Sequence, residues 1–179
     1  STIGAGIINE LYSAPSPNSS YIFHNNFVRG RLSTSSGAVH PSFQTSFLFS
    51  NNDIVIDGPI GSAVYTTSSG AAGSGSLQNN ILVNTSGSVS SRFKLDSIYN
   101  GIINNNNTSS AANDVVFLLT TPGTIVCASF DANVANSYQF DAIAGSTINV
   151  VMSLADLSAN NVGTVTTSGA GTINFDTGC

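Results

Sequence analysis

Apolar and polar residues alternate along short runs of the chain, and clusters of Gly, Pro, Ser and Asn separate these runs. In the run 43–49, Phe43, Thr45, Phe47 and Phe49 fall on one face of an extended strand, because successive side chains of a strand point to opposite faces. Further runs follow at 54–57, 62–67, 77–84, 89–99, 115–120, 125–130, 137–143, 146–154, 163–168 and 171–176. The pattern predicts a chain that is β-structured nearly throughout.

The same pattern predicts the fold class. A parallel sheet normally needs helices between its strands, and only residues 131–137 and 155–161 have a pattern compatible with a helical turn. Residues 115–120 and 125–130 are expected to form a hairpin joined at residues 121–123, which are Thr-Pro-Gly. No repeat of fixed length is apparent, which argues against solenoids and propellers. The expected fold is an all-β, antiparallel β-sandwich, pilin-like or Ig-like, with about ten short strands.

Three parts of the chain differ in composition. Residues 1–13 alternate like a strand, residues 14–20 are rich in Pro and Ser, and residues 21–179 carry the remaining runs. Two prolines prevent residues 14–20 from forming a helix or a central strand, so this segment is expected to be an extended spacer. Residues 21–179 contain no boundary and are expected to form a single β-sandwich domain.

The segment 1–13 has two possible roles. Its side chains Ile3, Ala5, Ile7 and Leu11 share one face of an extended strand. In one alternative it is an ordinary first strand that pairs within its own domain. In the other it is a donor strand that fills an open groove in a neighbouring copy, with main-chain hydrogen bonds and alternating side chains. Repeated head to tail, strand donation does not close on itself and produces a filament.

Composition and charge exclude several classes of function. Only 7% of residues are charged, whereas 29 Ser, 16 Thr, 21 Asn and 17 Gly account for 83 of 179 residues. The net charge of -5 gives no basic surface for a nucleic acid, and no apolar run reaches the length of a membrane-spanning helix. We therefore expect neither a nucleic-acid partner nor a membrane span, and a surface built from neutral hydrogen-bonding groups.

Several features indicate an extracellular location. The chain begins with Ser1, which is expected of a mature end from which a signal peptide has been removed. The pattern Asn-x-Ser/Thr occurs at Asn18, Asn84, Asn106 and Asn107, and all four lie in loop-like sequence. We expect some of these to carry N-glycans, although matches of this kind also arise by chance in a chain so rich in Asn and Ser.

The two cysteines predict a disulfide. Cys127 lies within an expected buried strand, and Cys179 follows the last expected strand. A bond between them would close a loop of about 50 residues and contribute about 4 kcal/mol in the loop-entropy model. It would also hold the last strand in place, since chain ends fray first.

No residue pattern indicates an enzyme, a cofactor or a metal site. The tetrapeptide Phe-Asp-Thr-Gly at 175–178 resembles the catalytic loop of aspartic proteases, but Asp176 has no second copy with which to share a proton. His24 and His40 are far apart and lack zinc-ligand spacing, and residues 131–136 lack the acidic density of a calcium loop. We therefore expect a protein without catalytic residues, cofactor or bound metal.

The amino-terminal segment, the four sequons and the charge-poor β sequence together resemble archaeal surface filament subunits, in particular the "thread" pilin family of Sulfolobus-like organisms. The resemblance implies a pilin-like sandwich, linkage of identical subunits by donor strands, N-glycans and a role in surface adhesion or biofilm. Two alternatives remain open at this stage: a viral capsid or spike jelly roll, and a secreted carbohydrate-binding or adhesin domain. The scattered Tyr residues and the absence of Trp favour the latter less.

Overall fold

The computed structural model describes residues 2–3, 8–10, 20–32, 39–41, 46–57, 64–66, 73–84, 93–96, 98–108, 115–119, 123 and 125–179. These residues form strands, turns and one short helix, and the strands belong to three sheets. Within the described ranges, no helix is long and apolar enough to cross a membrane.

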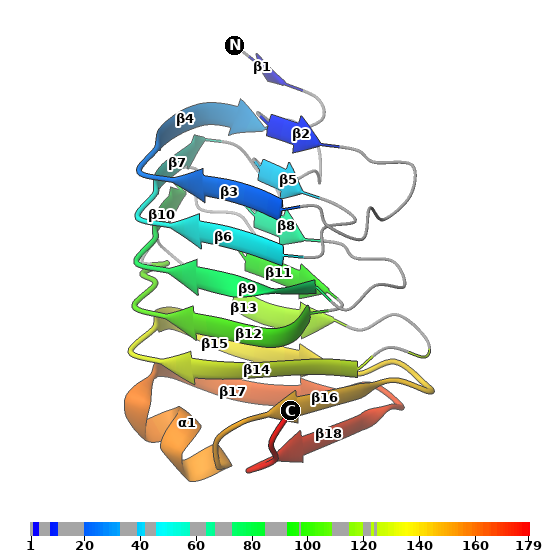
Figure 1. Ribbon diagram of the computed structural model, residues 1–179. Coiled ribbons are helices and arrows are strands. Elements are labelled where there is room, and N and C mark those ends of the chain that lie inside the picture. The colour runs from blue at the N-terminus through cyan, green and yellow to red at the C-terminus, as the bar shows by residue number, and fades with distance from the viewer. Residues whose placement is uncertain are drawn as a thin grey trace.

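Each sheet is built from strands that lie about one coil apart in the sequence (Figure 1). Sheet 1 consists of β1 (Thr2–Ile3), β4 (Phe27–Leu32), β7 (Asp53–Asp57) and β10 (Ile81–Asn84), in that order. Sheet 2 runs from β2 (Ile8–Glu10) through β5 (Val39–Pro41), β8 (Val64–Thr66), β11 (Phe93–Asp96), β13 (Val115–Leu119) and β15 (Val134–Asp141) to β17 (Val162–Ser168). Sheet 3 runs from β3 (Ser20–His24) through β6 (Ser46–Ser50), β9 (Gly73–Gln78), β12 (Ile98–Asn104), β14 (Ile125–Asp131) and β16 (Thr147–Val150) to β18 (Thr172–Phe175).

The fold is a parallel β-solenoid, and the expectation of an antiparallel β-sandwich is wrong. Every strand pair that the structure describes is parallel, and strands adjacent in the sequence lie in different sheets. The error has a physical cause, because alternating apolar and polar residues are compatible with any strand that is buried on one face, whichever way its neighbours run. In a solenoid the chain returns to the same sheet after a full coil, so no helix is needed between parallel neighbours.

The predicted hairpin at residues 121–123 is also corrected. The strands on either side of it, β13 and β14, belong to sheets 2 and 3 and do not pair with each other. Gly123 has a φ of +79° and lies in a turn, but this turn lies between a strand of sheet 2 and a strand of sheet 3 and does not form a hairpin. The strand positions were thus largely predictable, whereas their partners were not.

The core consists of side-chain columns that run along the solenoid axis. One column contains Phe23, Phe49, Leu77, Ile103 and Phe130, which are aligned by the strand register of sheet 3 and are all buried. The rings of Phe23 and Phe49 stack with their centroids 5.1 Å apart. Each coil therefore buries its apolar face against the coils on either side, as expected for a solenoid. The inward orientation predicted for Phe47 and Phe49 is confirmed, and Phe43 and Thr45 lie outside the described residues.

The one helix of the described chain, α1 (Leu154–Asn160), replaces a corner of the last coil (Figure 1). It overlaps residues 155–161, one of the two segments whose pattern is compatible with a helical turn, whereas the other, residues 131–137, contains the end of β14, a turn and the start of β15. Ser153 is the N-cap, and its Oγ accepts a hydrogen bond from the Asp156 N–H. Leu157 is fully buried and fixes the helix against the core.

The described part of the segment 1–13 pairs within its own chain. Thr2–Ile3 runs parallel to Arg31–Leu32 of β4, and Ile8–Glu10 runs parallel to Val39–Pro41 of β5. This is the alternative of an ordinary strand within its own domain. Of the four predicted donor residues, Ile3 lies in β1, and Ala5, Ile7 and Leu11 lie outside the described residues, as do residues 14–19 of the expected spacer.

Candidate functional site

The most regular feature of the molecule is a row of asparagines inside one corner of the solenoid. Successive coils place one side chain each in this row, and we call the set the asparagine ladder: Asn26, Asn52, Asn80, Asn106, Asn133 and Asn161. The members are 26, 28, 26, 27 and 28 residues apart. All but Asn26 are buried.

Each ladder amide links its own coil to the coils before and after it. The Nδ2 group of Asn80 donates to Oδ1 of Asn106 at 2.9 Å and to the carbonyl of Phe49 at 3.0 Å. Its Oδ1 accepts from Nδ2 and from the backbone N–H of Asn52. Both amide hydrogens and both lone pairs are therefore used, which removes the cost of burying a polar side chain. The pattern recurs at Asn52, Asn106 and Asn133.

A left-handed residue precedes the ladder position in five coils and turns the chain between sheet 3 and the next strand. Asn25, Asn51, Asn79, Asn105 and Ala132 have φ between 52° and 57°. Asn adopts this conformation more readily than other residues with a side chain, because its short amide can form local hydrogen bonds. The two residues of these Asn-Asn pairs therefore have different roles. The first forms the left-handed turn, and the side chain of the second belongs to the asparagine ladder.

The helix α1 closes the ladder at its C-terminal end. Nδ2 of Asn161 donates to the carbonyl of Leu157 at 3.0 Å, where a further coil would present an asparagine oxygen. Asn161 is also the C-cap of α1, and its backbone N–H donates to the same carbonyl. One residue therefore ends both the helix and the ladder.

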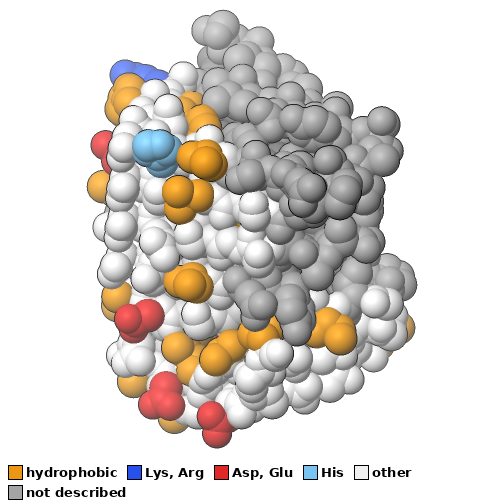
Figure 2. Space-filling view, in the orientation of Figure 1, with side chains coloured by type: hydrophobic (Ala, Val, Ile, Leu, Met, Phe, Trp, Pro, Cys, Tyr) orange, Lys and Arg blue, Asp and Glu red, His pale blue; other side chains and the backbone are white. Residues whose placement is uncertain are grey.

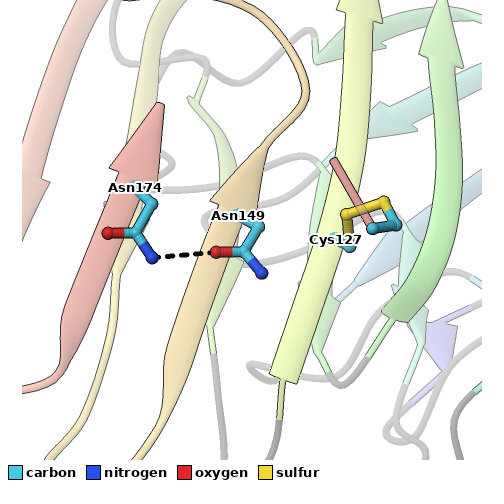
Figure 3. Close-up of a disulfide and its surroundings, with 4 residues drawn as sticks. Cys127, Asn149 and Asn174 are labelled. Atoms are coloured by element: carbon cyan, nitrogen blue, oxygen red, sulfur yellow. Dashed lines mark hydrogen bonds between the residues drawn. A yellow bond between two sulfur atoms is a disulfide. The ribbon is translucent and has the colours of Figure 1, made fainter. Parts of the chain in front are cut away.

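The predicted disulfide between Cys127 and Cys179 is confirmed (Figure 3). Cys127 lies in β14, and its immediate neighbours Val126 and Ala128 point into the core, so its sulfur lies on the outer side of sheet 3. The bond holds residues 176–179 back over that side, where Cys127 is wholly buried. On the neighbouring strands, Asn174 donates to Asn149 at 2.9 Å. The bond therefore fastens the last coil to the body of the solenoid.

The four predicted glycosylation sites are placed differently by the structure. Asn106 is a ladder residue, and its Nδ2, the atom that an N-glycan would modify, is buried and donates to Leu77 and Asn133. Asn107 is next to it, at the start of the following face, and is half-buried. Asn84 ends β10, its side chain lies outside the described part, and Asn18 is outside the described residues. Folding therefore makes Asn106 inaccessible and leaves the other three as predictions.

The other residues considered as metal ligands or catalytic groups are spread over several strands. His24 is exposed at the end of β3, and His40 lies in β5. Asp176 is exposed after β18 with a φ of +59°, and Asp131 is exposed at the end of β14. In the part of the chain that the structure describes, no three His, Cys, Asp or Glu residues lie close enough to hold a metal ion.

The C-terminal end of the solenoid carries a shallow hollow of about 240 Å³. Its lining combines Thr167 and Ser168 of β17 with Ile173 and Phe175 of β18. Ile173 and Phe175 pack against the core but are only partly buried. Apolar core side chains are therefore accessible at this end.

Sequence reasoning missed five of the six ladder asparagines and considered Asn106 only as a sequon. The usable signal was the pair Asn-Asn at 25–26, 51–52, 79–80, 105–106 and 160–161. Its spacing varies by two residues, and the chain holds 21 Asn in total, so the repeat was hidden in the composition. Comparison of the chain with protein-family models, with curated proteins and with solved structures found no match. The resemblance to the thread pilins therefore stays a prediction, and the sandwich that it implied is replaced by the solenoid.

Proposed function

We propose that the protein is a rigid structural element of an extracellular fibre or surface layer, with a role in adhesion. The asparagine ladder carries this proposal. It connects the coils through a continuous line of buried hydrogen bonds, so that a force along the axis is borne by side chains as well as by strand pairing.

Two further features support an extracellular role. The Cys127–Cys179 disulfide is compatible with an oxidising compartment. Only 7% of the residues are charged, and Figure 2 shows few charged side chains on the described part of one face, with uncharged polar and apolar groups between them. The charge of such a surface changes little when pH or salt concentration changes, because few groups on it titrate or attract counter-ions.

An antibody raised against the folded protein tests this proposal on the cells that produce it. We expect gold particles on intact, unpermeabilised cells, arranged along fibres or over a surface layer, and loss of that structure when the gene is deleted. Label that enters only after permeabilisation, or an unaltered cell surface after deletion, would refute the proposal.

A further inference from the structure

The two last strands of the solenoid present open edges. In β18, the N–H of Thr172 donates to Ser146 and the N–H of Asp176 donates to Met152, both toward the preceding coil. Backbone groups alternate sides along a strand, so the N–H and C=O groups of Ile173 and Phe175 point away from that coil. In β17, the carbonyl of Ser168 accepts from Ala142, so the backbone groups of Thr167 likewise point outward. Among the described residues, no strand pairs with either edge.

These edges surround exposed apolar surface. The hollow at this end is lined by Ile173 and Phe175. The helix α1 covers only one corner, and residues 176–179 turn back over the outer side of sheet 3, where the disulfide holds them (Figure 1). An uncovered parallel edge beside apolar core residues is a strong site for further strand addition.

We propose that this end binds the N-terminal end of a second copy of the chain, with β18 pairing in parallel with β3 and β17 with β2. These are the opposite end strands of sheets 3 and 2, so a second copy in the same orientation continues both sheets. In sheet 3, one register column runs from Tyr21 to Phe175, and continuation places Phe175 against Tyr21 of the next copy.

The exposure of one apolar column agrees with an uncovered C-terminal end. One outward column starts at Phe27 and ends at Val162, and its register passes through Asp53, Ile81, Asn107 and Val134. Phe27 and Val162 are 70% and 63% exposed, whereas Ile81 and Val134 between them are 46% and 36% exposed. Val162 lacks the neighbour that shields Ile81 and Val134, and a second copy stacked at the C-terminal end would cover it. Phe27 lies in β4, one coil inside β2 and β3, and β1 pairs with β4 only at Arg31 and Leu32, so the proposed contact does not extend the column at Phe27.

Charge selects the second copy's N-terminal end over its C-terminal end. Residues 1–32 contain Arg29 and Arg31 and one acidic residue, Glu10 in β2, whereas residues 125–179 contain four Asp and no Lys or Arg. Figure 2 shows blue at the N-terminal end and most of the red toward the C-terminal end. Head-to-tail contact therefore brings the acidic C-terminal end to an end where two Arg outnumber one Glu, whereas tail-to-tail contact brings Asp156 and Asp176 of both copies together. Because the head-to-tail contact is heterologous, it gives open-ended filaments.

A matched pair of substitutions at Thr167 tests whether the outer edge of β17 is a site of strand addition. Thr167→Pro removes an N–H that points away from β15, so it blocks strand addition without breaking a hydrogen bond to the preceding coil. Thr167→Val has a similar volume and keeps the N–H. Sedimentation velocity and negative-stain microscopy over a concentration series should show rods for the parent protein and Thr167→Val. We expect Thr167→Pro to need about ten-fold more protein for the same assembly, with an unchanged circular dichroism spectrum.

Charge variants test the orientation. Arg29→Glu and Asp176→Asn should each weaken assembly about three-fold at low salt and less at high salt, while Asp131→Asn, a matched change away from the end, should not. Asn tolerates the left-handed φ of residue 176. A parent that stays monomeric at all concentrations, equal assembly of the two Thr167 variants, or a closed dimer insensitive to Arg29→Glu would overturn the proposal. These measurements use purified protein, so they are independent of the surface location proposed above.

Discussion

Asn80 shows what one ladder residue contributes. Its amide makes hydrogen bonds with Phe49 and Asn106 and accepts two from Asn52, all in a fully buried site. We predict that Asn80→Ala lowers the free energy of unfolding by about 3 kcal/mol or more, because it leaves buried donors and an acceptor without partners. Urea denaturation followed by circular dichroism measures this loss.

The neighbouring Asn79 provides the control. It is exposed, and it contributes through its left-handed backbone, with a φ of 54°. Asn79→Ala should therefore cost only about 1 kcal/mol, the strain of placing Ala in that conformation. Equal losses for the two variants would show that the ladder amides do not stabilise the fold.

Ala132 occupies a turn position that four other coils fill with Asn. Its φ is 52° and its side chain is exposed, so a larger side chain meets no obstacle. We predict that Ala132→Asn stabilises the protein by about 1 kcal/mol and raises Tm by about 2–4 °C, since Asn accepts the left-handed region more readily. A scanning calorimetry trace with an unchanged or lower Tm would contradict this explanation of the Asn-Asn pairs.

Tyr138 is expected to make the folded protein less stable at alkaline pH. Burial raises the pKa of its hydroxyl well above the ordinary value of about 10, and the hydroxyl donates to the carbonyl of Val162. The folded state therefore keeps Tyr138 neutral while the unfolded state ionises. The contribution of Tyr138 to stability should be constant below about pH 10 and should fall as pH rises above it. Denaturation at a series of alkaline pH values measures the slope, and Tyr138→Phe should make it shallower. An identical slope in that variant would rule out Tyr138 as the cause.

Among the structural elements, the last coil depends on the disulfide. Cys127 and Cys179 are 52 residues apart, which corresponds to about 4 kcal/mol in the loop-entropy model. We predict that the double variant Cys127→Ala/Cys179→Ala loses about that much stability and that hydrogen exchange accelerates first in β18. Exchange measured by mass spectrometry locates the change.

Chemical reduction of the unmodified protein is the matched control for this variant. It should reproduce the faster exchange of β18, while β9 and β12 in the middle of sheet 3 stay protected. Uniform acceleration in all strands would contradict a local role for the bond.

Element positions could be predicted from the sequence, but element partners could not. The inward Phe47 and Phe49 and the disulfide follow from local pattern and cysteine count, and the structure confirms them. Residues 155–161 are one of two segments compatible with a helical turn, and only this one overlaps a helix. The pairing of β13 with β15 and of β14 with β16 joins residues that are a full coil apart in the sequence. The alternation of apolar and polar residues shows which face of a strand is buried, but it does not show which strand pairs with which.

At the scale of the whole molecule, the repeat was too irregular to find by a fixed period. The ladder asparagine recurs at spacings from 26 to 28, with Asn or Ala at the left-handed turn position before it in five coils. The site was missed for the same reason, because an asparagine that stabilises a solenoid interior and one that lies on a loop look alike in a chain this rich in Asn. In the sequence, the solenoid can therefore be recognised only from the six ladder asparagines taken together, and not from any single motif.

Nuclear Overhauser contacts in the isotope-labelled protein test the central claim, a parallel solenoid with an internal asparagine ladder, most directly. The structure predicts contacts between the side-chain amide protons of Asn52, Asn80 and Asn106 in sequence, together with contacts between strands one coil apart such as β9 and β12. Close contacts between the α-protons of β13 and β14, as in an antiparallel hairpin, and no contact between the ladder amides would contradict it.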